Sequence, residues 1–338
     1  MLTLFCGILS PTGNNKLYFL SIAIIIILIS CLRYGVGFDF YSYVDAINYS
    51  SVSDRFELIP RIIIELARWT EITQIFFVIS SIVMYGLIFY SFYRYSKFRL
   101  LSLVVFISYP LFFLISLGVV RQYLAVSFVI IGICLYINHN EKSKKFLGLF
   151  FVLTAILCHT SAMIMLPIIF ISNRLDQTFK LVTKVTILLI VIFVATFSYE
   201  IIMYTYPYYA IYLQENDSSG YKILALTVLL YLISSMAAKR SKDKKIIIYD
   251  NLFFIGVCLY SALIDFGTAP ARVAIFFLVF SCFSLPAIID FYPKIKSILK
   301  IKFVIFFGML YMSSLYFASI NSERDPLLPY VYFFEVKS

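Results

Sequence analysis

The chain alternates long apolar runs with short polar connections along almost its whole length. Nine apolar stretches come close to the roughly 20 residues that a helix needs to cross a bilayer. They lie at about 17–32, 73–93, 99–117, 121–138, 182–199, 221–238, 246–264, 272–289 and 303–319. This pattern predicts an all-α polytopic integral membrane protein that forms a single membrane domain over residues 1–338.

Residues 146–171 are also apolar but do not fit one span. A single pass there would place Arg174, Lys180 and Lys184 outside and invert every later connection. Two short passes, or a re-entrant pair broken near His159, restore a consistent charge pattern. We therefore expect about 11 passes, with the amino terminus inside, the carboxyl terminus outside and a cavity at the broken pass.

Three connections on the outer side are long: 33–72, 199–222 and the tail 320–338. Within the first, residues 58–69 predict a helix that is too short and too charged to span, and so lies at the membrane interface. Its apolar face is Ile62, Ile63, Leu66 and Trp69, and its charged face is Arg61, Glu65 and Arg68. The second is rich in Tyr, which suits either an aromatic belt or stacking against sugar rings.

Basic residues are sorted between the two sets of connections. One set holds 19 of the 28 Lys and Arg residues, of which 15 are Lys, so the positive-inside rule predicts that it is cytoplasmic. The other set holds 7 Arg among its 9 basic residues, together with 13 of the 18 acidic residues. Arg binds phosphate through two parallel hydrogen bonds, so we expect the chemistry on this outer face.

The composition further narrows the possible classes of protein and of binding partner. With 62% hydrophobic and 14% charged residues, the chain cannot be a soluble protein. The net charge of +10 lies mostly in short loops that meet anionic lipid, so nucleic acid is not an expected partner. The six Cys residues stand singly in apolar sequence, which indicates neither a metal site nor a disulfide framework. We expect no cofactor.

Arg33 and Asp39 form the first candidate site. Arg33 ends the first span, and Gly35 and Gly37 permit turns that bring Arg33 towards Asp39. Arg121, followed by Gln122, is a second candidate, because it lies between two apolar segments with almost no loop. A charge so near the hydrocarbon is costly and indicates function.

Two further candidates lie later in the chain. His159 stands at the predicted break, where it is either a general base or an ordinary buried His. Asp265 and Arg272 flank one short apolar connection, where they either pair or mark the bilayer edge.

Taken in order, these residues resemble the polysaccharide polymerases of the Wzy and EpsG type, which are bacterial enzymes of O-antigen, capsule and exopolysaccharide assembly. The resemblance rests on Arg33 with Gly37-Phe-Asp39-Phe-Tyr41, on Arg121-Gln122 with Ala125, on His159-Thr-Ser161-Ala with Pro167, on Ala271-Arg272 with Pro286, and on Pro329-Tyr330. It covers nearly the whole chain. Phe38 departs from the pattern, since a small or hydroxyl residue is more usual before the Asp.

The resemblance implies a GT-C-like membrane glycosyltransferase of the bacterial inner membrane, with its active site on the periplasmic or outer face. It implies transfer of the growing chain from one undecaprenyl diphosphate to the non-reducing end of a new repeat unit, without metal or nucleotide. A chain-length regulator is then a plausible partner protein. The expected catalytic residues are Arg33, Asp39, Arg121 and His159, and the expected substrate-binding residues are Arg272, Gln122, Tyr41, Tyr43 and Asp265.

Three other functions compete with this hypothesis. A membrane O-acyltransferase can also use a membrane His, but nothing in the Lys-rich loops suggests contacts to an acyl donor. A flippase for lipid-linked oligosaccharide also needs many spans, but it would carry charge through the depth of the bilayer instead of at one rim. A glycosyltransferase that uses undecaprenyl-phosphate sugars would place paired carboxylates in the first outer connection, where Asp39 and Asp45 stand. The three Arg candidates favour a diphosphate. The residues do not decide whether Asp39 or His159 is the base.

Overall fold

The computed structural model describes residues 15–171, 174–205, 219–267, 272–291, 295–320, 327 and 330–335. It is 83% helical, which confirms the all-α class. Within these ranges, six helices are long and apolar enough to cross a membrane: Gln74–Tyr95, Val120–Asn138, Gly220–Arg240, Lys244–Phe266, Arg272–Asp290 and Lys296–Phe317. Four shorter apolar helices are Lys16–Leu32, Arg99–Ser108, Thr160–Ile171 and Leu181–Phe197. The count of about 11 passes stays a prediction.

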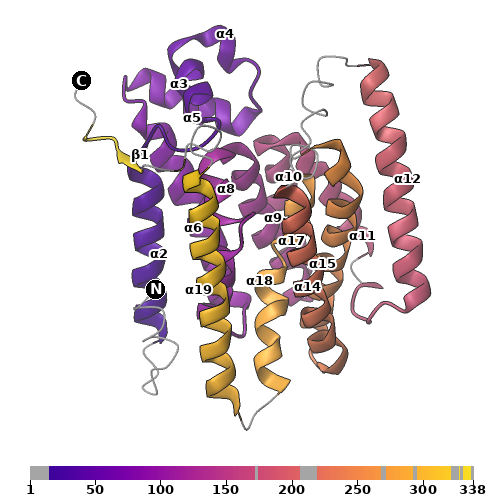
Figure 1. The fold of residues 1–338 in the computed structure, drawn as a ribbon. Coiled ribbons are helices and arrows are strands. Elements are labelled where there is room, and N and C mark those ends of the chain that lie inside the picture. Colours follow the sequence, from indigo (N-terminus) through magenta and orange to yellow (C-terminus); the bar gives the residue numbers. More distant parts are fainter. Residues whose placement is uncertain are drawn as a thin grey trace. The chain divides into compact units, whose positions relative to one another are not determined.

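The chain divides into two compact units, both built of helices (Figure 1). Unit 1 comprises Met1–Ile169 and Ile295–Ser338, and unit 2 comprises Phe170–Lys294. The elements of unit 1 are α2 (Asn15–Leu32), β1 (Arg33–Tyr34), α3 (Phe40–Asn48), α4 (Ser50–Ser53), α5 (Leu58–Trp69), α6 (Gln74–Tyr95), α7 (Arg99–Ser108), α8 (Phe113–Gly118), α9 (Val120–Asn138), α10 (Lys142–Cys158), η1 (Thr160–Met165), α19 (Lys296–Ile320) and β2 (Val331–Tyr332). Helix α11 (Leu166–Ile171) contains the boundary between the two units. The prediction of a single membrane domain is neither supported nor excluded by this division.

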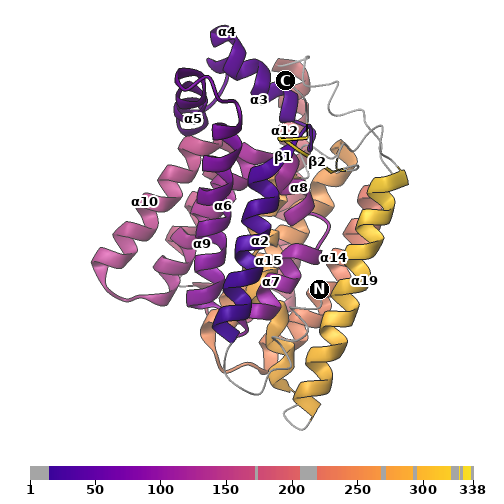
Figure 2. The ribbon, with the colours of Figure 1, turned by 90° about the vertical axis from the view of Figure 1, so that its left-hand side faces the viewer.

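Helices α9 and α10 form an antiparallel hairpin beside α6 (Figure 2). Two glycines allow the hairpin to close tightly. A Cβ atom at Gly132 would lie 2.8 Å from the carbonyl oxygen of Gly148, and one at Gly148 would lie 3.1 Å from the Tyr136 nitrogen. The start of α9 and the end of α10 therefore lie at the same end of the hairpin.

The predicted break near His159 is confirmed. Helix α10 ends at Cys158, His159 is extended with φ −162° and ψ 122°, and the 3-10 helix η1 follows at once. The predicted span 99–117 is also broken, between α7 and α8. Pro110 explains this second break, because a proline disfavours helical backbone at the residue before it, and Tyr109 is extended with φ −77° and ψ 127°.

Helix α5 has the predicted bounds, 58–69. Ile62, Leu66 and Trp69 are exposed, as the predicted apolar face requires, and Trp69 is 81% exposed. Ile63 differs from the prediction, because it is buried against the rest of unit 1 with Ile64. The placement of α5 at the membrane interface stays a prediction.

The carboxyl-terminal residues return to the end of the first helix. Strands β1 and β2 pair antiparallel, with Arg33 opposite Tyr332 and Tyr34 opposite Val331. The Phe333 nitrogen donates to the Leu32 carbonyl oxygen at 3.0 Å, and the Tyr330 hydroxyl donates to the Ile29 carbonyl oxygen. Pro329, part of the predicted tail 320–338, lies outside the described residues.

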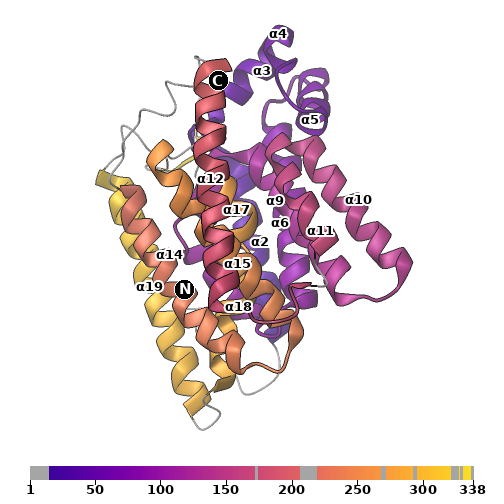
Figure 3. The ribbon, with the colours of Figure 1, turned by 90° about the vertical axis from the view of Figure 1, so that its right-hand side faces the viewer.

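Unit 2 contains α12 (Leu181–Thr205), α14 (Ser219–Arg240) and α15 (Lys244–Leu263), which Figure 3 shows from the side. Shorter helical turns complete it: η4 (Ile264–Phe266), η5 (Arg272–Ala274), α17 (Ile275–Leu278), α18 (Ser281–Ser284) and η6 (Leu285–Phe291). The buried Asp250 on α15 accepts a hydrogen bond of 2.6 Å from Ser234 on α14. Most of the Tyr-rich segment 199–222 lies outside the described residues.

Candidate functional site

The carboxylate of Glu57 lies between Arg121 and His159 in unit 1. Glu57 Oε2 is 2.9 Å from Arg121 Nη1, and Glu57 Oε1 is 2.8 Å from His159 Nδ1. The backbone nitrogen of Thr160 also donates to Oε1, at 3.4 Å. Two residues predicted as catalytic are thus held by one acidic side chain, which is only 14% exposed.

Glu57 is the N-cap residue of α5, and the packing of that helix fixes its position. Helix α5 buries Pro60, Ile63, Ile64 and Ala67, and it packs against α3, α6 and α10. The Glu57 side chain does not cap its own helix. It is therefore available to the two residues at the end of the α9–α10 hairpin.

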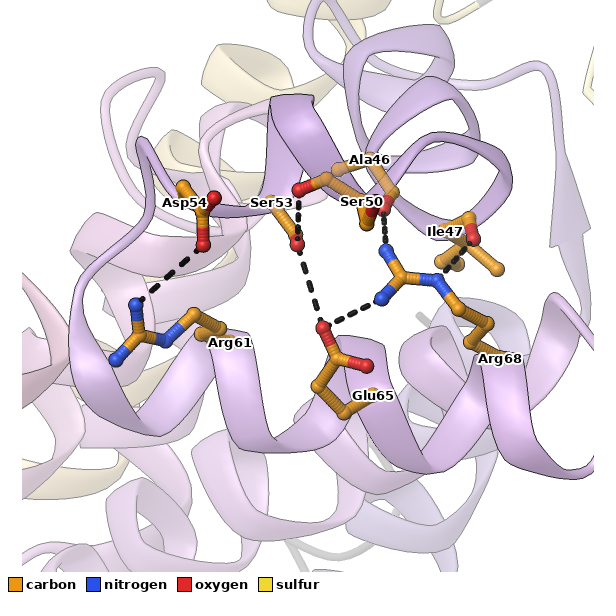
Figure 4. A network of polar contacts seen from close by, with 8 residues as sticks. All are labelled: Ala46, Ile47, Ser50, Ser53, Asp54, Arg61, Glu65 and Arg68. Atoms are coloured by element: carbon orange, nitrogen blue, oxygen red, sulfur yellow. Dashed lines mark hydrogen bonds and ion pairs between the residues drawn. The ribbon is translucent and has the colours of Figure 1, made fainter.

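Arg68 attaches α5 to the end of α3 (Figure 4). Its Nε donates to the Ile47 carbonyl oxygen at 2.8 Å, and its Nη2 donates to that of Ala46 at 2.6 Å. Glu65 accepts from Arg68 at 2.5 Å and from Ser53 at 3.3 Å. A cation at a helix C-terminus is favourable, because the last carbonyl groups carry partial negative charge. These contacts join α3, α4 and α5 into one cap above the hairpin.

Arg121 has two further contacts besides Glu57. Its backbone nitrogen donates to the Tyr43 hydroxyl at 3.3 Å, and its guanidinium lies 4.5 Å from the centre of the Phe56 ring. Tyr43 is buried and stacks on Phe76 with ring centres 4.7 Å apart. Burial, aided by the charge of Asp39, raises the pKa of Tyr43 to about 12, so its hydroxyl stays protonated.

The charge state of Glu57 determines which nitrogen of His159 carries a proton. Burial acts to raise the pKa of Glu57, but the hydrogen bond with His159 and the charge of Arg121 outweigh it and lower the pKa to about 2. Glu57 is therefore a carboxylate at neutral pH and accepts a hydrogen bond from Nδ1–H of His159. In neutral His159 the other nitrogen, Nε2, then holds the free electron pair.

Arg33 is fully buried beside this site, with 0% of its surface exposed. Its Nη1 donates to the Ser30 carbonyl oxygen at 2.5 Å and to the Ser30 hydroxyl at 2.6 Å, and its guanidinium lies 4.9 Å from the centre of the Phe77 ring. Nε and Nη2 have no hydrogen-bond partner in the part of the chain that the structure describes. The guanidinium turns inward to Ser30 and Ser81, and the expected approach of Arg33 to Asp39 stays a prediction.

The turn after Arg33 packs on the segment before Arg121. Gly35 and Gly37 have positive φ values of 65° and 104°, as their predicted role in turns requires. A Cβ atom at Gly37 would lie 2.6 Å from the Cα of Gly118. The first two candidate sites are therefore neighbours, joined through glycine backbone.

The other predicted residues of unit 1 have different environments. Asp39 is half-buried at the start of α3, and Tyr41 is exposed by 60%. Gln122 is buried, with 3% of its surface exposed.

Arg272 and Asp265 belong to unit 2. Asp265 is exposed and accepts a hydrogen bond from the hydroxyl of Tyr221, and Arg272 is half-buried. Tyr221 is one of the tyrosines of the predicted outer segment 199–222.

Sequence reasoning missed Glu57. Its partners lie 64 and 102 residues further along the chain, so no local pattern joins them. One local signal was present: an acidic residue stands directly before the amphipathic helix at 58–69, where the helix dipole favours negative charge.

Comparison with known proteins gives one match. The model of the EpsG family matches residues 16–332 of the chain. No curated protein matches. No solved structure matches either, so the GT-C-like arrangement stays a prediction.

Proposed function

Because the chain belongs to the EpsG family, we propose that it polymerises oligosaccharide repeat units carried on undecaprenyl diphosphate, with the Glu57, Arg121 and His159 side chains at the reacting centre. The family suggests a polysaccharide polymerase in general. The observation that carries the specific proposal is the Glu57 carboxylate, bonded to Arg121 on one oxygen and to His159 on the other. This arrangement couples a cation to a potential base in one fixed unit.

His159 is proposed as the general base. With Nδ1–H held by the Glu57 carboxylate, Nε2 is the atom that accepts a proton, and the carboxylate stabilises the imidazolium that forms. The His159 side chain is 27% exposed, and a substrate hydroxyl is proposed to reach it at Nε2. Asp39 is the alternative base. It is half-buried at the start of α3, and His159 is preferred because of the Glu57 carboxylate on Nδ1.

The reaction is a glycosyl transfer between two lipid-linked sugars. The oxygen of the acceptor hydroxyl, at the non-reducing end of the new unit, forms a bond to the anomeric carbon of the growing chain. The bond from that carbon to the diphosphate oxygen breaks, and its electron pair leaves with undecaprenyl diphosphate. The proton of the acceptor hydroxyl moves to His159 Nε2.

Two arginines are proposed to stabilise the charge that develops on the leaving diphosphate. Arg121 is oriented by Glu57, Phe56 and Tyr43, and it offers directional hydrogen bonds from a fixed position. Arg33 forms no ion pair among the described residues, so its positive charge is uncompensated. A buried charge acts strongly where little water screens it, and Arg33 is proposed to act from beneath the site without direct contact.

The remaining predicted residues are proposed to bind substrate. Tyr41, which is exposed, offers an aromatic face to a sugar ring. Tyr43 accepts a hydrogen bond from the Arg121 backbone, and Gln122 follows Arg121 in the chain, so both are proposed to act on substrate through the position of Arg121. In unit 2, Arg272 and Asp265 are proposed as a second set of contacts to lipid-linked substrate.

We place this chemistry on the periplasmic or outer face of the bacterial inner membrane, because the Arg-rich and acidic connections are opposite the Lys-rich ones. The reaction is proposed to need no metal, since the arginines supply the positive charge. A chain-length regulator is proposed as a partner protein.

The test is a gel of surface glycan from cells that lack this gene and carry a plasmid copy. We expect the wild-type gene to restore a ladder of chain lengths. Arg121→Ala and His159→Ala should give only the single capped repeat unit, while immunoblots show the protein at normal level in the membrane. Arg55→Ala is the matched control, because Arg55 is exposed in the same outer segment, and it should restore the ladder.

Two results would contradict the proposal. A normal ladder from both Arg121→Ala and His159→Ala would show that these residues do not form the active site. Loss of the single-repeat band as well as the ladder would place the missing step at or before transfer across the membrane, as a flippase or an undecaprenyl-phosphate-sugar transferase would.

A further inference from the structure

A cavity of about 360 Å³ lies at the Lys-rich end of helices α6, α9 and α10, remote in the hairpin from Arg121 and His159. Helix α9 forms its floor through Ile131 and Leu135, both buried. Helices α6 and α10 stand on either side of α9 (Figure 2). The cavity is therefore a groove over α9 that is open on one side.

The polar residues of the groove are two tyrosines, Tyr90 and Tyr95, and three basic residues. Arg94 on α6, Lys144 on α10 and His139 from the connection between α9 and α10 line it, and the described lining contains no carboxylate. Arg94 and Lys144 form no ion pair or hydrogen bond in the part of the chain that the structure describes. On the opposite face, by contrast, Arg68 and Arg121 each pair with a Glu.

The start of α10 adds to this excess of positive charge. Its first turn contains Lys142, Lys144 and Lys145, and the single acidic residue at this end is the exposed N-cap residue Glu141. Cations at a helix N-terminus are unfavourable, because the free N–H groups there already carry partial positive charge. A bound anion would remove this repulsion and would give Arg94 and Lys144 a common partner.

Apolar surface continues from the groove along the helices. Leu147 and Phe151 on α10 line the wall, and Phe146 and Phe150 on its other side are exposed by 72% and 55%. Such aromatic and aliphatic surface suits acyl chains. The combination of a basic head site with an apolar path fits a lipid better than a soluble phosphate.

We propose that this groove binds the phosphate headgroup of an anionic phospholipid, such as phosphatidylglycerol, in the leaflet that meets the Lys-rich connections. Arg94 and Lys144 hold the phosphate, His139 lies at its side, and the acyl chains run along α10. Basic pockets between membrane helices on the cytoplasmic side are typical binding sites for such headgroups. This site is separate from the proposed catalytic residues, so the two proposals stand or fall independently.

Native mass spectrometry of the delipidated full-length protein in detergent tests the proposal. The probes are phosphatidylglycerol, phosphatidylcholine with the same acyl chains, and inorganic phosphate. We expect the wild type to bind phosphatidylglycerol about tenfold more tightly than phosphatidylcholine, and the double variant Arg94→Gln with Lys144→Gln to lose that preference. Lys242→Gln with Lys245→Gln removes two exposed Lys charges at the start of α15 and should keep the preference for phosphatidylglycerol.

A charge-preserving double variant, Arg94→Lys with Lys144→Arg, should retain the preference and separates loss of charge from misfolding. The proposal is overturned by unchanged lipid preference in the Gln variant, or by an equal loss in the Lys242 and Lys245 control. Displacement of the lipid by inorganic phosphate at similar concentration would also overturn it, because it would identify a free phosphate as the ligand.

Discussion

Gly132 and Gly148 lie in direct backbone contact where α9 and α10 cross. Each is eleven residues from a member of the candidate site, Arg121 on α9 and His159 after α10. In an antiparallel pair, equal distances from the crossing point place two residues at the same height. The glycine contact therefore sets the level at which Arg121 and His159 meet Glu57.

Gly148→Ala should separate the two helices and disturb the site. The added methyl group would press on the Gly132 carbonyl and on the Tyr136 nitrogen, both backbone atoms that cannot turn away. We expect a loss of about 1–3 kcal/mol in stability and a shorter glycan ladder. The measurements are thermal unfolding in detergent and the complementation gel.

Gly86→Ala is the matched control, because a Cβ atom at Gly86 on α6 would meet nothing within 4 Å. It should leave both stability and ladder unchanged or slightly improve stability, since Ala favours a helix over Gly. Equal losses from Gly86→Ala and Gly148→Ala would contradict the role of the crossing.

Glu57→Gln should abolish most of the polymer while keeping the shape of the side chain. The neutral amide no longer stabilises an imidazolium on His159 or balances Arg121. We expect transfer to fall by roughly 10²–10⁴-fold, measured with purified protein and lipid-linked repeat units. Glu71→Gln, at an exposed position of the same outer segment, should retain activity.

The stability of the folded protein at low pH depends on the same Glu57 carboxylate. The folded-state pKa of Glu57, about 2, is below the ordinary value of 4.5, so its contribution is complete above pH 4.5 and is lost as the pH falls from 4.5 towards 2. We expect stability to decline by up to about 3 kcal/mol over that window. Unfolding at a series of pH values measures the decline, which Glu57→Gln should largely remove; identical pH curves for the two proteins would refute the assigned pKa.

Tyr43→Phe tests the hydrogen bond that the Arg121 backbone nitrogen donates to the Tyr43 hydroxyl. The ring keeps its place on Phe76, but the hydroxyl that accepts from Arg121 is lost. One hydrogen bond is worth about 1 kcal/mol, so we expect transfer to fall roughly fivefold. Tyr49→Phe, at an exposed Tyr of the same segment, should have no effect on the rate; an equal effect would show that the Tyr43 hydroxyl does not position Arg121.

Phe333→Pro tests the return of the carboxyl-terminal strand to Arg33. Proline removes the N–H that donates to the Leu32 carbonyl oxygen, one residue from Arg33. We expect a loss of about 1–3 kcal/mol in stability and a weaker ladder, whereas Phe333→Leu keeps the donor and should resemble the wild type. A stable, fully active Phe333→Pro protein would show that β2 is dispensable.

Some of the fold and site could be read without a structure. The break at His159 followed from the charge rule, because one span would have inverted the later loops, and the helix at 58–69 followed from its amphipathic pattern. The division of 99–117 into α7 and α8 could have been read from Pro110 and was not. The inward turn of Arg33 followed from no pattern, since its partner Ser81 lies 48 residues away.

The sequence by itself determined the helical membrane class, the sorting of Lys and Arg between two sets of connections, and the turn at Gly35 and Gly37, and it pointed to Arg121 and His159 as candidates. Those features depend on composition and on neighbours within a few residues. The tertiary structure alone decided that Glu57 joins Arg121 to His159 and that Arg33 is buried without an acidic partner among the described residues. Both depend on packing between segments far apart in the chain: the Gly132–Gly148 crossing sets the level of Arg121 and His159, and contact with Ser81 on α6 holds Arg33.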